Sequence, residues 1–466
     1  MAAGCGAELQ LVNPPGALSF FFLPMHLVII GNGITGVTAA RTARQLQPAA
    51  RITLVSAESA HHFSRPALMY VYLGDLRYQD IKPYEDWFWA ENKLELVQAT
   101  ATGLDADRKT VQLSTGAELA YDKLLLATGS VGRRGEWPGA ELAGVQTFVT
   151  LPDLEQMTRD TREGVREAVV VGGGLIGVEL AEMLAAKGIR VTMLIRDARY
   201  WGAVLPPEEA ALVQRQFDAH HIICRYETEL KTILADESGR VRAVQTTAGD
   251  ELPAQWLGLA IGVQPNLTLA QVAGLDTDKG ILVDAHLQTS LPDVYAAGDC
   301  AQLRTPGDGE MAVEQLWYTG RQQGETVAYA LCDAPRPYQR GLWFNSAKFF
   351  DLEYQTYGRV PAEPRPDEHS FCWQHPKKDH LLRINFRRDS LAVTGLNVLG
   401  LRHRHDTWAG WLQTGTPVTE VLANLGAANF DPEFFRQHEA GIVGAFNEQF
   451  PAHAVQLRRR KGLFRV

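Results

Sequence analysis

Two segments of the chain share one pattern of apolar, glycine and polar positions. In each, an apolar run precedes a glycine-rich turn, and apolar residues then recur at helical spacing. The first segment is MHLVIIGNGITGVTAARTARQL, from Met25, and the second is EAVVVGGGLIGVELAEMLAAKGIRVTML, from Glu167. The pattern predicts a strand, a tight turn and a helix twice, as in a dinucleotide-binding unit.

The glycines of both turns have the spacing G-x-G-x-x-G. They are Gly31, Gly33 and Gly36 in the first turn and Gly172, Gly174 and Gly177 in the second. The first glycine permits the tight turn, the second lets a pyrophosphate approach the backbone, and the third lets helix and strand pack closely. The N-terminus of each helix offers N–H groups to the phosphates. Two complete motifs predict two dinucleotide sites.

Three further positions fit such sites. A second strand, RITLVSAE, ends near Glu58, where an acid would hold a ribose hydroxyl pair. The segment YDKLLLATGS reads as a buried strand that enters a turn at Thr128 and Gly129, and TSLPDVYAAGDCAQ reads as a strand that ends at Gly298 and Asp299.

Composition narrows the class of protein. The chain has 466 residues and a net charge of −9, which suits several globular domains and argues against a nucleic-acid-binding surface. The apolar run ALSFFFLPMHLVII is broken by Pro24 and His26, so we expect no membrane span. Residues 1–24 are expected to be a disordered extension rather than a signal peptide.

Cysteine and histidine usage points to neither disulfides nor metals. The five cysteines are scattered without a C-x-x-C pair, which favours a reducing cytoplasm. The histidines of HRHD at 403–406 and the pair at 61–62 lack partners at ligand spacing, so no metal site is expected.

The order of these motifs resembles the FAD-dependent pyridine nucleotide-disulfide oxidoreductase superfamily. The likeness covers about residues 25–335. The stretch AIGVQPNLTLAQVAGLDTDKGILVDAHLQTS is especially similar to the branch of rubredoxin reductases, ferredoxin reductases and the NADH-handling part of assimilatory nitrite reductase. The resemblance implies that the first unit binds FAD and the second uses NAD(P)H as a diffusible substrate.

The resemblance also implies roles for individual residues. It places Gly31, Gly33, Gly36 and Glu58 at the adenosine half of FAD, Arg133 on its phosphate-side loop and Asp299 at the ribityl chain. Trp317 and Tyr318 would line the flavin ring, although ordinary aromatic core is an equal alternative.

The implied architecture is an α/β fold with two Rossmann-like, glutathione-reductase-like domains and an α+β C-terminal domain. The FAD domain would comprise residues 25–148 and 268–335, and the NAD(P) domain, residues 149–267, would be inserted into it. Residues 336–466 would form an interface or acceptor domain, which either forms a homodimer or shapes the acceptor side.

The helix after the first unit, SRPALMYVYLG, has no cysteine. Relatives that reduce disulfides or peroxides generally carry a reactive cysteine there, and a thiolate is the nucleophile of such chemistry. We therefore expect an NAD(P)H oxidoreductase in which hydride passes to FAD and electrons continue to a separate acceptor, such as a small redox protein. A quinone reductase, a direct flavin oxidase and a non-catalytic NAD(P)H sensor remain open as well.

The choice of nicotinamide cofactor depends on the segment VTMLIRDARYW. Ile195 stands where NAD-selective relatives place an acid, and Arg196, with Arg199 nearby, could hold the 2′-phosphate of NADP. Gly177 and Asp197 favour NAD instead. The pattern favours acceptance of NADPH alongside NADH and leaves the preference open.

The resemblance implies a charged pair at the flavin edge. A basic residue on the helix after the first unit pairs with an acid two residues beyond the third glycine of the second motif. These positions hold Arg65 and Glu179. We predict an Arg65–Glu179 ion pair in which Arg65 stabilises electron density near flavin N5 and Glu179 orients the nicotinamide.

Overall fold

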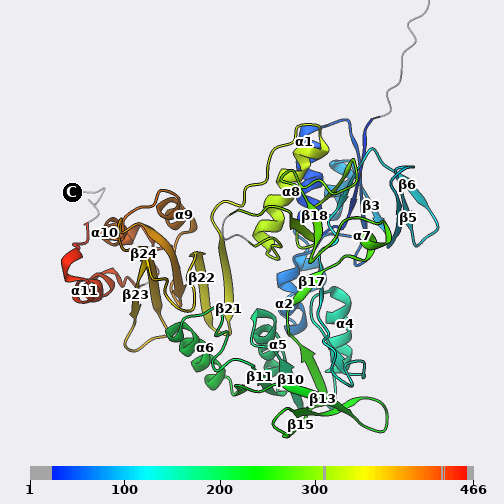
Figure 1. Cartoon of the computed structure of the whole chain (residues 1–466). Coiled ribbons are helices and arrows are strands. Elements are labelled where there is room, and N and C mark those ends of the chain that lie inside the picture. The colour runs from blue at the N-terminus through cyan, green and yellow to red at the C-terminus, as the bar shows by residue number, and fades with distance from the viewer. Residues whose placement is uncertain (1–23, 308–310, 432–433, 435, 459–466) are drawn as a thin grey trace, which may run out of the picture.

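The computed structural model describes residues 24–307, 311–431, 434 and 436–458. The expected N-terminal extension therefore lies outside the described residues, except for Pro24. Three bodies are visible, with the two nucleotide-binding units stacked on one side and the C-terminal domain beside them (Figure 1). This arrangement confirms the prediction of two Rossmann-like units followed by an α+β domain.

The first unit is built on a five-stranded parallel sheet in the order β19-β7-β1-β2-β3. Its strands are β1 (His26–Ile30), β2 (Arg51–Ser56), β3 (Leu94–Gln98), β7 (Lys123–Leu126) and β19 (Val294–Ala296). Strands β1, β2, β7 and β19 are almost wholly buried, because apolar side chains cover both faces, as parallel sheets require, whereas the edge strand β3 is partly exposed. Strand β19 arrives from beyond the second unit, so the first unit is split in sequence.

Helices α1 (Ile34–Leu46) and α8 (Trp317–Leu331) pack together on this sheet (Figure 1). Glycines allow the close approach, because a Cβ at Gly324 would lie 2.5 Å from the Thr35 carbonyl oxygen. Smaller elements complete the unit: α2 (Leu68–Leu73), α3 (Asp86–Glu91), β4 (Ala101–Asp105), β5 (Thr110–Leu113), β6 (Glu118–Ala120), β8 (Ser130–Gly132), β17 (Val263–Pro265), α7 (Thr268–Val272), β18 (Ile281–Val283) and β20 (Ala301–Leu303).

The second unit repeats the design with the order β12-β11-β10-β16-β9. Its elements are β9 (Val145–Gln146), α4 (Leu151–Asp160), β10 (Glu167–Val171), α5 (Leu175–Ala186), β11 (Arg190–Leu194), α6 (Pro207–Ala219), β12 (Ile223–Arg225), β13 (Leu230–Ala235), β14 (Val241–Thr246), β15 (Glu251–Pro253) and β16 (Trp256–Leu259). Strand β9 joins this sheet before the expected limit at residue 148. Two residues are too few to leave a periodic pattern in the sequence.

The C-terminal domain is an antiparallel sheet in the order β21-β22-β25-β24-β23, with helices on one face. Its elements are β21 (Phe344–Phe349), β22 (Leu352–Gly358), β23 (Glu368–Gln374), β24 (Leu381–Arg387), β25 (Val393–Leu399), α9 (His405–Gln413), α10 (Val418–Ala423) and α11 (Glu439–Gln449). This combination of an antiparallel sheet and helices agrees with the predicted α+β C-terminal domain.

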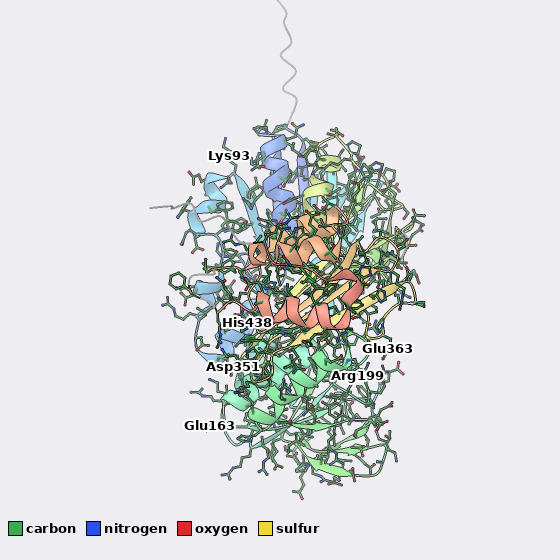
Figure 2. The ribbon with its side chains drawn as sticks, turned by 90° about the vertical axis from the view of Figure 1, so that its left-hand side faces the viewer. Lys93, Glu163, Arg199, Asp351, Glu363 and His438 are labelled. Carbon is green, nitrogen blue, oxygen red and sulfur yellow. The ribbon has the colours of Figure 1, made fainter. Side chains whose placement is uncertain are left out.

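The second unit and the C-terminal domain share one apolar core. Phe349 and Leu381 of the domain lie in the same buried cluster as Tyr200 and Phe217 of the unit. Figure 2 marks a further meeting point, where Arg199 of the unit lies 3.7 Å from the Glu363 carboxylate. The C-terminal domain is therefore packed on the second unit rather than tethered loosely.

A charged cluster is buried in this interface. The Arg383 guanidinium of β24 donates to the Glu209 carboxylate of α6 at 2.7 and 3.0 Å and to Glu208 at 2.6 Å. The Asn397 amide donates to Glu209 at 3.1 Å. The Glu209 side chain is fully buried and that of Arg383 nearly so. Each charge therefore depends on its partner for compensation.

Candidate functional site

In the first glycine-rich turn, Gly31 and Gly36 lie tightly against neighbouring backbone, whereas Gly33 faces open space. A Cβ at Gly31, where φ is +115°, would lie 2.1 Å from the Ala127 carbonyl oxygen. One at Gly36 would lie 2.0 Å from the Gly31 carbonyl oxygen. A Cβ at Gly33 would meet no heavy atom within 4 Å. The bare backbone at Gly33 thus faces open space, as a pyrophosphate site requires.

The second turn has the same geometry. Gly172, with φ of +117°, could not carry a Cβ because it would lie 2.2 Å from the Ala260 carbonyl oxygen. The position of Gly177 is closed by the Gly172 carbonyl oxygen at 2.4 Å, and Gly174 is open. Both turns therefore fit a dinucleotide in shape.

The predicted ion pair between Arg65 and Glu179 is wrong in this structure. The Arg65 guanidinium donates instead to both oxygens of Glu58, at 2.9 and 2.6 Å, and to the Val149 carbonyl oxygen at 2.7 Å. Arg65 lies in a 3-10 turn, Arg65–Ala67, ahead of helix α2. From there it reaches the end of β2, where Glu58 also accepts the Leu151 N–H at 2.7 Å.

Replacing Arg65 by alanine is therefore expected to weaken FAD binding rather than slow flavin reduction. Loss of a charge-assisted pair frees the Glu58 carboxylate, which is predicted to contact the adenosine ribose, and should raise the Kd for FAD about 10- to 100-fold. Titration of the apoprotein with FAD measures this. Arg77→Ala, which breaks the exposed Arg77–Asp80 pair, is the control. An unchanged Kd with a slowed reduction rate would instead place Arg65 at the flavin edge.

Glu179 lies on α5 with no hydrogen bond or ion pair to any described residue. Burial, and then the nearby charge of Glu182, raise the pKa of Glu179 to about 7. Lys348 of β21 reaches the next helical turn instead, where it donates to Glu182 at 3.1 Å. Glu179 is therefore an unpartnered carboxyl group that titrates near neutral pH, as functional acids do.

NAD(P)H binding is expected to depend on the protonation of Glu179. Below its raised pKa the group is neutral and can donate to an amide, and above it the negative charge opposes an anionic substrate. The Kd for NAD(P)H should therefore rise about 3- to 10-fold between pH 6 and pH 8. Glu179→Gln should remove most of this pH dependence and keep the low-pH affinity. Equal pH profiles for the two proteins would exclude this role.

The segment around Gly298 and Asp299 closes over helix α1. Gly298 has φ of +80°, and a Cβ there would lie 2.4 Å from the Thr35 hydroxyl oxygen. Burial raises the pKa of Asp299, whose carboxylate accepts a hydrogen bond from the Ser130 hydroxyl at 2.9 Å. Gln315 in turn donates to Ser130 at 2.8 Å. Asp299 is thus held in a defined position beside the first turn.

The turn at Thr128 and Gly129 is tied to the returning chain. The Thr128 hydroxyl donates to the Asn266 carbonyl oxygen at 2.9 Å, and the Asn266 N–H donates to Gly129 at 2.9 Å. Gly129 has φ of +68°, which favours glycine. Arg133 is exposed, and its backbone N–H donates to the Gly262 carbonyl oxygen at 3.0 Å. Strands β8 and β17, through which the chain leaves the first unit and returns to it, therefore lie side by side.

A buried network behind Gly298 was missed from the sequence. The Gly298 N–H donates to the Gln323 amide oxygen at 2.7 Å, and the Gln323 amide nitrogen donates to Glu314 at 3.1 Å. Glu314 is 2% exposed and also accepts from Tyr338 at 2.7 Å and Arg340 at 3.3 Å. Tyr338 and Arg340, in the linker to the C-terminal domain, are thereby connected through Glu314 and Gln323 to the loop that carries Asp299. An acid beside glutamines in a loop carries no periodic signal.

The two aromatic residues predicted at the flavin ring have different settings. Trp317 is 37% exposed, whereas Tyr318 packs on Phe344 of β21 at 4.2 Å between ring centroids. The Tyr318 hydroxyl lies 3.3 Å from that of Ser346. Tyr318 therefore joins the first unit to the C-terminal domain, and Trp317 is open to a ligand or partner.

The residues around the predicted site for the 2′-phosphate of NADP also differ in exposure and in contacts. The Arg196 side chain is 80% exposed, and its nearest acid is Asp197 at 3.9 Å. Arg199 is engaged with Glu363 and the Gly202 carbonyl oxygen. Ile195 is buried. Arg196 is therefore the more exposed of the two arginines, and its only ion pair among the described residues is the long one with Asp197.

The cysteine beside Asp299 has no redox geometry. Cys300 is fully buried and donates weakly to the Leu126 and Ala297 carbonyl oxygens at 3.4 Å. Burial raises the pKa of its thiol, so it stays protonated and unreactive. The described cysteines, Cys224, Cys300, Cys332 and Cys372, are all free. No group of potential ligands suited to a metal ion occurs in the described part of the chain.

Two glycine-rich turns on parallel sheets, with Glu58 and Asp299 held beyond two strand ends of the first sheet, are typical of a protein that binds two dinucleotides. The family model described as pyridine nucleotide-disulphide oxidoreductase matches residues 25–324. The chain belongs to this family and is an FAD-dependent NAD(P)H oxidoreductase, as predicted.

Individual relatives add detail. The ferredoxin reductase subunit of 5,5′-dehydrodivanillate O-demethylase from Sphingobium is 30% identical over 86% of this chain and 98% of the relative. A putidaredoxin reductase, solved in covalent complex with putidaredoxin, is 25% identical with a TM-score of 0.73, over 84% of this chain and 93% of that one. The NAD-dependent persulfide reductase of A. fulgidus is 25% identical with a TM-score of 0.79, over 92% and 84%.

Proposed function

We propose that the chain is the reductase of a small iron–sulfur redox protein and takes its electrons from NAD(P)H. The observation that carries this is the similarity to a ferredoxin reductase subunit along almost the whole of that relative. The structural likeness to the persulfide reductase leaves a persulfide or disulfide acceptor as the rival. The segment HFSRPALMYVYLG, which contains α2, has no cysteine, and this favours the redox protein.

We assign the following binding roles to the residues of the two glycine-rich turns and their neighbours. Gly33 and Glu58 would hold FAD at its pyrophosphate and adenosine, and Asp299 would hold the ribityl chain. Gly174 and Glu179 would receive the nicotinamide substrate. FAD, when bound, supplies the conversion between two-electron and one-electron chemistry. The exposed Trp317, at the border with the C-terminal domain, would face the acceptor.

The acceptor is tested by reducing the FAD-loaded protein with NADH and following reoxidation. We expect fast reoxidation by a ferredoxin or rubredoxin, and slow reoxidation by quinones and oxygen. Reductive titration should consume two electrons per FAD because the sequence has no C-x-x-C pair. A reduced state that persists with every acceptor would favour an NAD(P)H sensor. Fastest reoxidation by a quinone would favour a quinone reductase, and fastest reoxidation by oxygen would favour a flavin oxidase.

NADPH is expected to be accepted through Arg196. The exposed guanidinium can reach a 2′-phosphate, so Arg196→Ala should lower kcat/KM for NADPH about tenfold. The value for NADH in the same variant is the internal control and should stay unchanged. Equal losses with both substrates would show that Arg196 does not bind the phosphate.

The compartment and assembly are part of the proposal. Free thiols at all described cysteines suit a reducing cytoplasm. None of the described helices has the length and apolar character of a membrane span. Light scattering of the purified protein would show whether the C-terminal domain forms a homodimer.

A further inference from the structure

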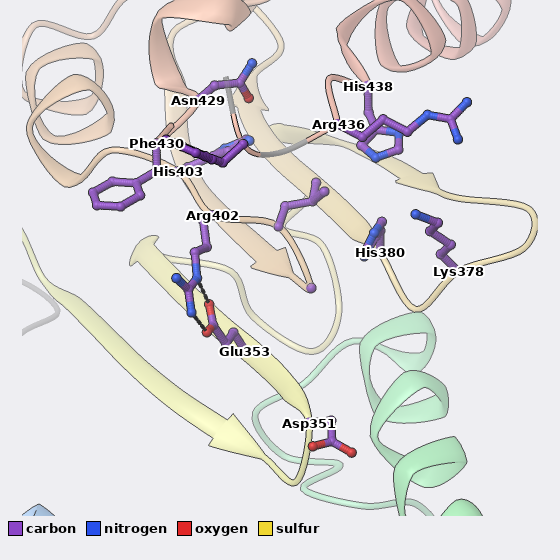
Figure 3. Close-up of a pocket in the computed structure, with 13 residues that line it drawn as sticks. Asp351, Glu353, Lys378, His380, Arg402, His403, Asn429, Phe430, Arg436 and His438 are labelled. Atoms are coloured by element: carbon purple, nitrogen blue, oxygen red, sulfur yellow. Dashed lines mark hydrogen bonds and ion pairs between the residues drawn. The ribbon is translucent and has the colours of Figure 1, made fainter. Parts of the chain in front are cut away.

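A cavity of about 410 Å³ lies in the C-terminal domain, apart from both glycine-rich turns. One side is the turn between β23 and β24, which carries Lys378 and His380. The opposite side is the segment before α11, which carries Arg436 and His438. Figure 3 shows these four side chains together on one side of the cavity, with Arg436 and His438 opposite His380 and Lys378. The volume is within the range of small-molecule sites.

The basic groups of this cavity crowd one another. The imidazole ring of His438 lies 5.4 Å from that of His380 and 5.2 Å from that of His375, between ring centroids. Burial, and then the charges of His380, His375, Arg436 and Lys378, lower the pKa of His438. Such a concentration of like charge is unfavourable in the free protein unless an anion compensates it.

The carboxylates near the cavity are already engaged elsewhere. Glu353 forms a two-point ion pair with Arg402, as Figure 3 shows, and Asp351 lies 3.2 Å from the His220 ring. Asp379 accepts from Arg215 and Gln216 of α6 at 3.0 and 2.9 Å. Among the described residues, none of these acids faces the charges of Lys378 and Arg436 as a partner.

One further atom lacks a partner. The Nδ1 atom of His380 is buried and makes no hydrogen bond to any described residue. A buried polar atom without a partner is costly and usually indicates a missing ligand or water. Phe430, which is 47% exposed, lines the same cavity and offers an apolar surface.

We propose that this cavity binds a small organic molecule through a phosphate monoester group. Lys378 and Arg436 supply two full positive charges for the dianion, and His380 and His438 supply further donors from other directions. A tetrahedral dianion accepts from several sides at once, whereas a carboxylate is planar and carries one charge. The ring of Phe430 would cover the apolar body of the ligand.

The test is calorimetric titration of the FAD-loaded protein with inorganic phosphate, in the presence of saturating NAD⁺ so that the glycine-rich turns are occupied. The variant is Lys378→Ala with Arg436→Ala, and the matched control is Lys377→Ala, an exposed lysine beside the cavity that does not line it. We expect the Kd for phosphate to rise at least tenfold in the variant and to stay unchanged in the control. Acetate should bind more weakly than phosphate to the wild type.

Sulfate provides a pH readout, because its charge is constant between pH 6 and pH 8. A bound dianion favours protonated imidazoles at His380 and His438, so sulfate should bind more tightly at pH 6 than at pH 8 by at least threefold. The groups that face these rings are His375, Lys378, Asp379 and Arg436. Equal phosphate affinity in wild type and double variant, or acetate binding as tight as phosphate, would overturn the proposal as adventitious ion binding.

Discussion

Valine at Gly33 is expected to yield a folded protein that no longer retains FAD. The Cβ of this residue would meet no protein atom within 4 Å, and its φ of −67° suits any amino acid. The added methyl groups would instead occupy the space that a pyrophosphate needs. We expect the Kd for FAD to rise at least 100-fold, because the close backbone approach and its N–H contacts are lost together.

The companion change at Gly174 separates the two sites. Gly174→Val should keep the yellow colour of the flavoprotein and abolish its reduction by NAD(P)H, while dithionite still reduces it. Circular dichroism verifies that both variants fold. Gly36→Val is the contrasting variant, since its side chain would strike the Gly31 carbonyl oxygen and should prevent folding. Full FAD binding by Gly33→Val would show that the first turn is not the FAD site.

Replacing Arg383 by methionine is expected to destabilise the protein by about 3–5 kcal/mol, because it leaves the carboxylate of Glu209 buried without compensation. Glu209 has 0% of its side chain exposed, so water cannot replace the lost partner. Burial lowers the pKa of Arg383, but the hydrogen bond and charge of Glu209 outweigh this effect and raise it. Urea unfolding, followed by the tryptophan signal and by flavin release, measures the loss.

The double variant Arg383→Met with Glu209→Leu distinguishes a buried charge from a packing defect. Removing both charges should restore most of the stability, since apolar pairs often replace buried ion pairs without loss. The control is Arg402→Met, which breaks an exposed pair with Glu353 and should leave the free energy of unfolding nearly unchanged. A double variant as unstable as Arg383→Met would indicate that packing, not charge, is responsible.

The two nucleotide-binding units could be predicted because backbone geometry dictates their glycines. Gly31 and Gly172 adopt positive φ and lie against a neighbouring carbonyl oxygen, so only glycine fits, and the spacing is visible in the sequence. The strands around them are buried on both faces and read as continuous apolar runs. Local geometric requirements of this kind can be read directly from the sequence.

The partners of charged residues could not be predicted in the same way. Arg65 lies in a 3-10 turn rather than in the helix that follows, and this small shift directs it to Glu58 instead of Glu179. Arg383 sits in a strand, where a charge normally marks the solvent face. Strand β24 is instead covered by α6 on one side and by the C-terminal helices on the other, so its charge is buried. Both outcomes depend on packing between distant segments.

The network at Glu314 illustrates the same limit. It joins Gly298, Gln323 and the linker residue Arg340, which belong to three different stretches of chain. None of these positions repeats at a helical or strand period, so the sequence gives no sign that they meet.

During synthesis on a ribosome, the first nucleotide-binding unit must wait for a distant part of the chain. Its sheet lacks the edge strand β19, and helix α1 lacks its neighbour α8, until residues 294–331 emerge. The second unit is translated in the interval and can fold first, over roughly 10 to 40 seconds at bacterial elongation rates. Meanwhile the apolar edge of β7 and one face of α1 stay uncovered. We expect this delay to leave apolar surface of the nascent chain accessible to chaperones, and FAD can be captured only once residues 294–331 have joined the first unit.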